Sequence, residues 1–352
     1  CQAGGSVIDW VMRAEGVSFR HAVELLREGL AAPTESSSPP VKKSTVRKMP
    51  APVDVEAGDR EVLGQVVGFY HETLRQSPEA LSYLEERGLK SEEMIERFRL
   101  GYANRTLGYR LPAKNRKAGR EMRERLQRLG VLRDSGHEHF NGSVVIPVFD
   151  EAGTVREMYG RKIGGQLRKG TPLHLYLPGP HEGVWNEAAL RESREIILCE
   201  SLIDALTFWC AGYRNVTSAF GTNGFSTELL EAFVSYGVER VLIAFDRDDA
   251  GEKAAEKLAE RLGSEGVDCF RIGFPRGMDA NEYALKMKPP RRALEVLLGC
   301  AEWISGPMID RVTAPSSAPA SPAPRGAPPS ARGSGAAHAA PQRPRPPGHG
   351  GG

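Results

Sequence analysis

EIILCESLIDAL (195–206), VTSAFGT (216–222) and RVLIAFDRDDAG (240–251) are the segments that decide the fold. Each contains a short apolar run that leads directly into polar residues or glycine, and amphipathic segments separate the three runs. This pattern is typical of buried parallel strands joined by helices. The expected strands are Ile196–Cys199, Val216–Ala219 and Val241–Phe245.

Polar residues follow each expected strand directly. Glu200 follows the first strand and Gly221-Thr222 the second, while Asp246 and Asp248 follow the third. In parallel sheets the reactive groups lie just beyond the carboxyl ends of the strands, so we expect the three acids at one edge. Two carboxylates at 4 Å repel by about 4 kcal/mol at an effective dielectric near 20. We therefore expect a cation between them, and oxygen ligands of this kind suit Mg²⁺.

An alternative interpretation needs no metal. Glu200 would be an ordinary surface acid, and residues 246–249 would form the N-cap of a helix over Ala250–Glu265. That interpretation suffices for an isolated Asp-x-Asp, but it does not account for polar residues after all three strands in succession.

Taken in order, Glu200, Gly221-Thr222 and the pattern Asp246-x-Asp248-x-Ala250-Gly251 resemble the Toprim domain of bacterial primases, topoisomerases and some nucleases. The resemblance runs from Glu195 to about Tyr283. It implies an α/β fold with a Rossmann-like parallel sheet and flanking helices. It also implies Mg²⁺ or Mn²⁺ held by acidic side chains, with Glu200 able to move a proton. The implied metal ligands are Glu200, Asp204, Asp246, Asp248 and Asp279, of which Glu200, Asp246 and Asp248 are the catalytic ones.

Two of these acids lie outside the central motif. Asp204 comes four residues after Glu200, one helical turn along, so it can face the same site. Asp279 in GMDANEY matches a later G-x-D-P-D motif of the family, in which Asn281 replaces the second Asp. The alternative is that Asp279 or Asn281 is a helix cap.

The composition is that of a globular chain. It has 352 residues with 47 Lys and Arg against 45 Asp and Glu, so net charge indicates little about partners. The five cysteines lack paired spacing, which favours a reducing cytoplasm over a disulfide framework. No apolar stretch approaches 18 residues and no signal peptide is evident, so we expect no membrane association.

Residues 1–30 read CQAGGSVIDWVMRAEGVSFRHAVELLREGL, in which a lone Cys and two Gly precede two amphipathic helical segments. This stretch resembles the end of the zinc ribbon that opens bacterial primases of the DnaG type. Cys1 falls on the last zinc ligand of that ribbon. Zinc takes four ligands, so the resemblance implies Zn²⁺ only in a complete chain that supplies the other three upstream. We expect the present chain to bind no stoichiometric zinc, and to extend a supplied primer better than it starts one.

A second, independent resemblance covers residues 70–103, YHETLRQSPEALSYLEERGLKSEEMIERFRLGYA. Ser77-Pro78 predicts a helix start with Pro at N1, Gly88 a helix end, and Ser91 a further N-cap. The order of these signals resembles the N-terminal part of the DnaG-type catalytic core. It separates primases from the other Toprim enzymes, and predicts a mixed α/β subdomain before the Toprim domain.

Basic residues dominate the range Arg97–Arg133, with twelve Lys and Arg against two acids. We expect Arg116, Lys117 and Arg120 to bind the phosphates of a single-stranded template. The alternative is an ordinary solvated helix face.

Phe140–Ile163 predicts a β-hairpin with its turn near Gly153. A similar hairpin in primases closes with an Arg that faces the active site, and Arg161 matches it. The sequence departs from that pattern at Ser143, where relatives commonly have Arg, and at His174, near a usual Lys. These departures suggest a divergent branch, such as a phage or mobile element.

The chain divides into six expected segments. They are a zinc-ribbon remnant (1–30), a flexible linker (31–60), the primase N-terminal subdomain (61–188), the Toprim domain (189–290), the start of a helical bundle (291–311, with a helix over Leu294–Ile304) and a disordered Pro/Ala/Gly-rich tail (312–352).

The resemblance implies a DNA primase that makes short RNA primers on single-stranded DNA from nucleoside triphosphates during replication. A replicative helicase is a possible partner, although no docking domain follows the core. Two alternatives stay open: a Toprim nuclease or related phosphotransfer enzyme, and an inactive single-stranded nucleic-acid-binding remnant. A type IA topoisomerase fits less well, because no domain with a nucleophilic Tyr follows.

Overall fold

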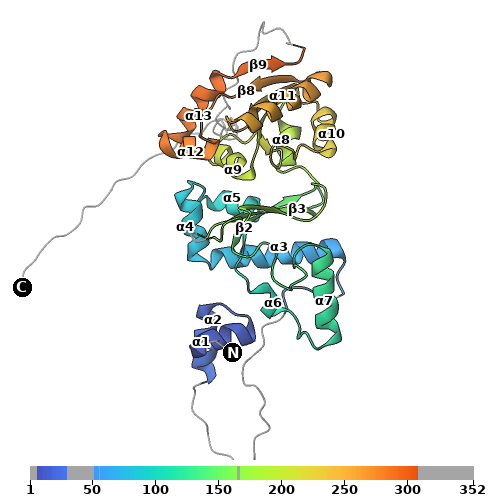
Figure 1. Ribbon diagram of the computed structural model, residues 1–352, viewed down its shortest axis with the longest axis vertical. Helices are drawn as coiled ribbons and strands as arrows, with labels where there is room; N and C mark the ends of the chain where they lie inside the picture. The colour runs from blue at the N-terminus through green and yellow to red at the C-terminus, as the bar shows by residue number, and fades with distance from the viewer. Residues whose placement is uncertain (1–5, 30–50, 55, 165–166, 308–352) are drawn as a thin grey trace, which may run out of the picture. The chain divides into compact units, whose positions relative to one another are not determined.

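A computed structural model describes residues 6–29, 51–54, 56–164 and 167–307, all within one compact unit (Figure 1). Cys1, the range 312–352 and most of the expected linker lie outside these residues. None of the helices in the described ranges combines the length and apolarity that a bilayer crossing requires.

The described part begins with a helix pair, α1 (Val7–Glu15) and α2 (Phe19–Gly29). Ser6 starts α1 with a capping box, in which its side chain accepts from the Asp9 amide while the Asp9 carboxylate accepts from the Ser6 amide. Both interactions satisfy amide groups that a helix start leaves unpaired.

The expected linker is too long at its C-terminal end. Val53 and Ala57 are 3% and 8% exposed and belong to the hydrophobic cluster beneath α3 (Asp59–Arg75). The backbone amide of Asp54 donates to Gln65 on that helix, at 2.7 Å. These residues are packed because two apolar side chains within a polar stretch find a buried position beside α3.

Helices and an antiparallel sheet form the first subdomain. Its helices after α3 are α4 (Pro78–Glu86), α5 (Glu92–Arg97), α6 (Leu107–Arg110) and α7 (Lys117–Arg128). Pro78 is the first residue of α4, and the Ser91 side chain accepts from the Met94 amide at the start of α5, as predicted.

The four strands of this subdomain pair antiparallel in chain order. They are β1 (Gly101–Ala103), β2 (Ser143–Phe149), β3 (Val155–Lys162) and β4 (His174–Tyr176). The predicted hairpin is confirmed as β2–β3. Asp150 accepts from the Thr154 amide at 2.8 Å across its turn, and Gly153 takes a φ of 76°, which favours glycine.

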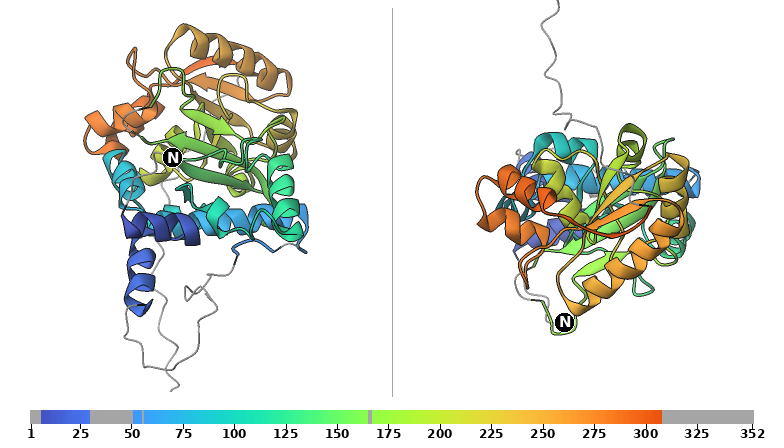
Figure 2. Two further views of the ribbon diagram at one scale, coloured as in Figure 1. Left: turned by 60° about the horizontal axis from the view of Figure 1, so that its bottom comes forward. Right: turned by 90° about the horizontal axis from the view of Figure 1, so that it is seen from above.

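A five-stranded sheet of order β6-β5-β7-β8-β9 forms the second subdomain (Figure 2). The first four strands in this order are parallel, which confirms the predicted α/β fold class. They are β5 (Glu195–Cys199), β6 (Val216–Ser218), β7 (Arg240–Ala244) and β8 (Asp268–Arg271). The three expected strands are therefore present to within one residue at each end.

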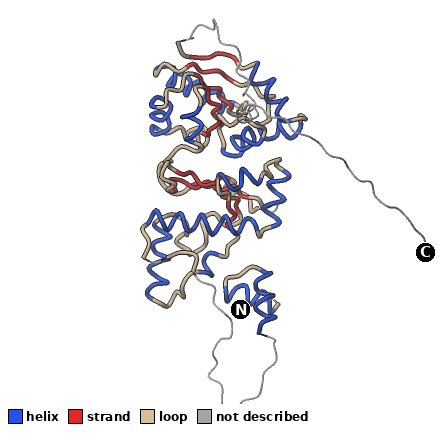
Figure 3. The backbone as a smooth tube through the Cα atoms, turned by 180° about the vertical axis from the view of Figure 1, so that it is seen from behind, coloured by secondary structure: helices blue, strands red, loops and turns tan. Residues whose placement is uncertain are grey.

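Alternate residues of a strand point to opposite faces of the sheet. Both faces of this sheet are buried because helices cover each of them. Ile197 and Cys199 belong to one hydrophobic cluster, together with residues of α9 (Leu202–Cys210) and α12 (Ala280–Lys286). Ile196 and Leu198 belong to another, together with α8 (Glu187–Glu192), α10 (Thr227–Ser235) and α11 (Asp249–Ser264). Figure 3 shows these helices (blue) around the strands (red).

The expected helix over Leu294–Ile304 is wrong in its second half. Helix α13 (Pro290–Gly299) ends before Cys300, and β9 (Glu302–Ser305) pairs antiparallel with β8 at the edge of the sheet. Trp303 and Ile304 are aromatic and β-branched residues that favour a strand, and β8 offers an unpaired edge to receive them.

Candidate active site

Two acids meet at the carboxyl edge of the parallel sheet. Neighbouring strands β5 and β7 pair in register, with Cys199 opposite Ala244, so Glu200 and Asp246 leave the sheet at the same level. The backbone amide of Asp246 donates to Oε2 of Glu200 at 3.3 Å. The structure thus places the first and third motifs side by side.

Asp248 has a role in the fold as well. It is the N-cap of α11, and its Oδ1 accepts from the Gly251 amide at 2.7 Å. The helix-cap interpretation is therefore correct for this residue, although one carboxylate oxygen is enough for the cap. Gly251 is required here, because a Cβ at this position would lie 2.2 Å from the Asp246 carbonyl oxygen.

The two outlying acids lie on the side of the sheet that α9 and α12 cover. Asp204, only 4% exposed, accepts from the Ser201 hydroxyl at 2.6 Å and from the Asn281 amide at 3.1 Å. Asp279 is the N-cap of α12, where it accepts from the Glu282 amide at 2.6 Å. The capping alternative for Asp279 is therefore realised.

Electrostatics couple these five acids. Burial, followed by the charges of Asp246 and Asp248, raises the pKa of Glu200 to about 7. Burial, followed by the charges of Asp279 and Asp248, raises the pKa of Asp246. The pKa of Asp204 rises through burial and through Asp279. Without a cation, negative charge at this edge is costly, since every carboxylate opposes ionisation of its neighbours.

Arg271, at the end of β8, supplies positive charge that the sequence interpretation missed. Its guanidinium donates to the carbonyl oxygens of Phe245 and Asp246, at 2.9 and 3.0 Å, and pairs with Glu252 at 3.1 Å. It lowers the pKa of Glu200 and of Asp246, but burial outweighs it at both groups. The only sequence signal was its position at the end of the next parallel strand.

The five acids are of the type that binds a divalent metal, but the structure does not arrange them as a ready metal site. All five groups are carboxylates, the ligands that Mg²⁺ and Mn²⁺ prefer, and burial together with neighbouring carboxylates raises the pKa of Glu200, Asp204 and Asp246. Over the described ranges, however, no three Asp, Glu, His or Cys side chains form a ready ligand group.

A basic groove of about 1340 Å³ lies in the first subdomain. Lys and Arg side chains line it from segments that are far apart in the sequence. They are Arg105, Lys114, Arg123, Arg133, Lys162, Arg168 and Lys169. The first four belong to the predicted basic run, whereas Lys162 and the last two come from β3 and the segment after it. Tyr102 and Tyr109 add aromatic surface.

The three basic residues singled out in the sequence do not line this groove. Arg116 is the N-cap residue of α7, while Lys117 and Arg120 lie on that helix. Lys117 and Arg120 face Glu121 and Glu124, at 3.8 and 3.9 Å, in exposed i,i+4 pairs that contribute little to stability. Their role in template binding stays a prediction.

Arg161 lies on β3 beside His174 on β4. Its Nη1 donates to Nε2 of His174, and Nδ1 of that ring is 2.9 Å from the Tyr159 hydroxyl. Within the described residues Arg161 forms no ion pair, so its charge is available to an anionic ligand. His174 departs from the family pattern, yet it forms a hydrogen bond with Arg161, the residue that matches the pattern.

A buried acid–histidine pair was also missed. Glu157, 2% exposed, accepts from Nδ1 of His181 at 3.0 Å. The His181 ring lies 5.5 Å from Phe220, the residue before Gly221 in the second motif. The pair therefore supports the loop beside Glu200. Glu157 and His181 are 24 residues apart, so no sequence signal indicated that they pair.

Two family models match the chain. The model of the DNA primase catalytic core, N-terminal domain, matches residues 69–177, and a Toprim-like model matches residues 197–284. Together they cover the two subdomains that contain the basic groove and the acidic edge.

Curated DNA primases are similar to the chain over most of its length. The DNA primase of Halalkalibacterium halodurans is 27% identical over 323 residues, which span 84% of this chain and 50% of that protein. The DNA primase of Aquifex aeolicus is 28% identical over 296 residues, 80% of this chain and 55% of that protein. The chain thus spans about half the length of the relatives it matches.

Solved structures show the same fold. The zinc-binding and RNA polymerase domains of the Aquifex aeolicus primase match with a TM-score of 0.59 and 24% identity, covering 86% of this chain and 72% of that one. A DnaG primase catalytic domain bound to single-stranded DNA matches with a TM-score of 0.55 and 21% identity, covering 70% and 82%.

Proposed function

We propose that this chain, which contains a bacterial DnaG-type primase core, synthesises short RNA primers on single-stranded DNA from nucleoside triphosphates. The observation behind the proposal is the pairing of two sites in one compact unit. An edge of coupled carboxylates follows the parallel sheet, and a groove lined by Lys and Arg lies in the subdomain before it.

The carboxylates are the proposed metal-binding groups. Glu200, Asp246 and Asp248 would hold Mg²⁺ or Mn²⁺, with Asp204 and Asp279 completing the set. When bound, such a metal supplies charge stabilisation to triphosphate oxygens and activates an attacking hydroxyl. Zinc enters the proposal only for a longer chain that places further ligands beside Cys1.

Glu200 is the proposed proton-transfer group. Before a cation binds, burial and the charges of Asp246 and Asp248 hold its pKa at about 7, so the group can carry a proton near neutral pH. Its place next to the Asp246 amide fixes it at the carboxyl edge of the sheet. It would accept the proton of the hydroxyl that attacks the incoming nucleotide.

Arg161 and the basic groove are the proposed substrate-binding elements. Arg161, aligned by His174, offers a planar donor that suits a phosphate group. The groove offers seven basic side chains and two tyrosines, which suit the phosphates and bases of a single strand. A solved relative bound to single-stranded DNA supports this assignment by analogy.

The test is incubation of the chain with single-stranded DNA, labelled nucleoside triphosphates and Mg²⁺ or Mn²⁺. Alkali-sensitive products that appear without a supplied primer would support the proposal. Shortened DNA fragments would instead indicate a Toprim nuclease. Binding of the DNA without either product would indicate an inactive nucleic-acid-binding protein.

A further inference from the structure

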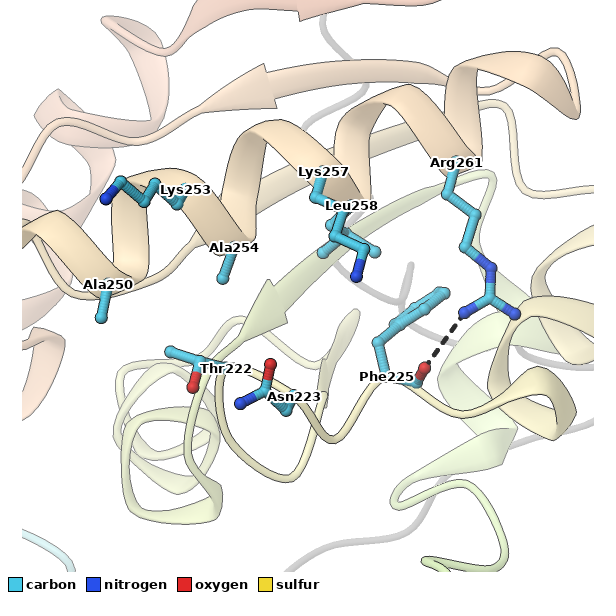
Figure 4. Close-up of a pocket in the computed structure, with 9 residues that line it drawn as sticks. All are labelled: Thr222, Asn223, Phe225, Ala250, Lys253, Ala254, Lys257, Leu258 and Arg261. Atoms are coloured by element: carbon cyan, nitrogen blue, oxygen red, sulfur yellow. Dashed lines mark hydrogen bonds between the residues drawn. The ribbon is translucent and has the colours of Figure 1, made fainter.

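A second cavity, of about 330 Å³, lies between α11 and the loop that follows β6 (Figure 4). Helix α11 lines it with Lys253, Lys257 and Arg261. The three cations are four residues apart, so they lie on one helix face at steps of about 6 Å along the axis. None of the catalytic or template-binding roles proposed above uses these residues.

This row of charges lacks a compensating partner at two of its three positions. Like charges at i,i+4 disfavour a helix. In the part of the chain that the structure describes, neither Lys253 nor Lys257 forms an ion pair, although both are exposed. The acids at helical spacing from these lysines are Asp249, Glu256 and Glu260, and among the described residues none of them pairs with either lysine. The two ammonium groups are therefore available to an external anion.

Arg261 closes the far end of the cavity. It donates to the Phe225 carbonyl oxygen at 3.2 Å and to the Thr227 hydroxyl at 3.4 Å, and it lies over the Phe225 ring at 5.4 Å. In Figure 4 the Lys257 ammonium points into the space between helix and loop, while Lys253 extends toward the N-terminal end of α11. The cavity thus combines a cationic wall with an aromatic ring.

Both walls of the cavity begin at the acidic edge. The loop wall starts at Gly221, whose amide donates to the Glu200 carbonyl oxygen at 2.7 Å. Its compact shape requires Gly224, because a Cβ there would lie 2.3 Å from the Ala219 carbonyl oxygen. The helix wall starts at Asp248, the N-cap of α11. A ligand that leaves the acids along α11 therefore meets Lys253 first.

We propose that this cavity binds the phosphodiester backbone of the growing strand as it leaves the acidic edge. Lys253 and Lys257 contact successive phosphates, and Phe225 packs against a sugar or base, as aromatic side chains do in single-strand sites. A row of cations suits a chain of phosphates better than one terminal triphosphate. The inference deepens the proposed function, on which it rests, by adding a site for the product.

The test compares Lys253→Gln/Lys257→Gln with wild type in the full chain. Binding of a 12-nucleotide RNA primer annealed to DNA is measured from 50 to 200 mM salt, and binding of ATP alone is measured in parallel. We expect the log–log salt slope for the duplex to fall by about 1 to 2, since each phosphate contact contributes about 0.7–0.9. We expect ATP binding to remain unchanged.

The matched control is Lys288→Gln/Arg292→Gln, which removes the same charge from exposed positions that do not line the cavity. Lys253→Arg/Lys257→Arg keeps both charges and should retain the wild-type slope. A slope that falls only in the Gln variant is then due to lost charge and not to misfolding. An unchanged slope in the Gln variant would overturn the proposal. So would loss of ATP binding with duplex binding intact, because the cavity would then be a nucleotide site.

The binding measurement needs no catalysis, so the two proposals fail separately. A chain that binds the duplex through Lys253 and Lys257 yet makes no primer contradicts the proposed function alone. A chain that makes primers while the Gln variant binds and extends them normally contradicts the cavity assignment alone.

Discussion

Arg161 on β3 donates a hydrogen bond to Nε2 of His174 on β4. A guanidinium is only a donor, so Nε2 must accept and Nδ1 must bear the proton that it donates to Tyr159. Burial and Arg161 lower the pKa of His174 to about 4, which keeps the ring neutral at physiological pH. A neutral His therefore aligns an Arg without repelling it.

The first prediction concerns this alignment. His174→Ala should raise KM for nucleoside triphosphates about tenfold, roughly 1.4 kcal/mol of binding, with a smaller change in kcat. His174→Gln keeps an acceptor and should restore part of the loss. Steady-state kinetics of primer extension check this, and equal KM values in all three proteins would contradict the alignment.

The second prediction concerns the acidic edge. Asp246→Asn and Asp248→Asn should each reduce nucleotide transfer at least about 100-fold, because a metal ligand is lost. Neither should unfold the chain. Removing the Asp246 charge relieves repulsion, and Asn caps α11 about as well as Asp248 does.

Asp249→Asn is the matched control, since it removes an exposed acid next to the cluster. It should keep near wild-type activity. Thermal unfolding of all three variants separates loss of chemistry from loss of fold. Full activity in both Asp246→Asn and Asp248→Asn would rule out the metal assignment.

The third prediction compares two basic surfaces. Neutralising Arg133, Arg168 and Lys169 in the groove should flatten the salt dependence of single-stranded DNA binding by about 0.7 in slope for each lost contact. Neutralising Arg116, Lys117 and Arg120 should also flatten it if the sequence prediction is right. If the salt slope falls only in the Arg116, Lys117 and Arg120 variant, the groove is excluded as the template path.

The fourth prediction concerns Glu138, which is 4% exposed and lines the groove. Burial raises its pKa to about 7 from an ordinary 4.5. Between these two pH values the folded chain keeps a proton on Glu138 that the unfolded chain has lost. Its contribution to stability is therefore greatest below about pH 4.5 and is lost as the pH rises to about 7.

Glu138→Gln should consequently gain stability over wild type as the pH rises from 5 to 8, by up to about 3 kcal/mol. Its side-chain oxygen can still accept from the Leu107 amide. Urea unfolding at several pH values measures the difference, with exposed Glu265→Gln as the control. A difference between Glu138→Gln and wild type that does not vary with pH would refute this account.

The fifth prediction concerns Asn281, a fully buried residue of α12. Its side chain donates to the Arg87 carbonyl oxygen and the Thr207 hydroxyl, both at 2.8 Å, and accepts from the Arg87 guanidinium at 3.1 Å. Asn281→Ala should cost about 2 kcal/mol, because it removes three hydrogen bonds made by a fully buried side chain. Thermal unfolding checks this, with Lys286→Ala on the exposed face as the control.

The strands and the first acids could be predicted because their signals are local. Apolar runs mark β5, β6 and β7, and parallel strands deliver the residues that follow them to one edge. The β2–β3 hairpin was equally readable, since its turn residues lie between two apolar runs. Asp248 shows the limit of such arguments, because the same carboxylate caps α11 and faces the acidic edge.

The features that were missed depend on pairing between distant segments. β9 forms because β8 presents an open edge to it. The sequence of α13 and of the residues after it gives no sign of that edge. Arg271 reaches Asp246 only because β8 lies beside β7. The groove gathers Arg105, Lys162 and Arg168 from three separate segments, so the charge run alone did not reveal it.

Metal-dependent nucleotide transfer at the acidic edge can be measured as ribonucleotide incorporation onto a supplied primer annealed to single-stranded DNA. Wild type and Asp246→Asn are compared side by side in Mg²⁺ and in Mn²⁺. We expect template-directed extension by the wild type that requires the metal and is lost in the folded variant. Equal extension by both proteins, or cleavage of the DNA in place of extension, would contradict this expectation.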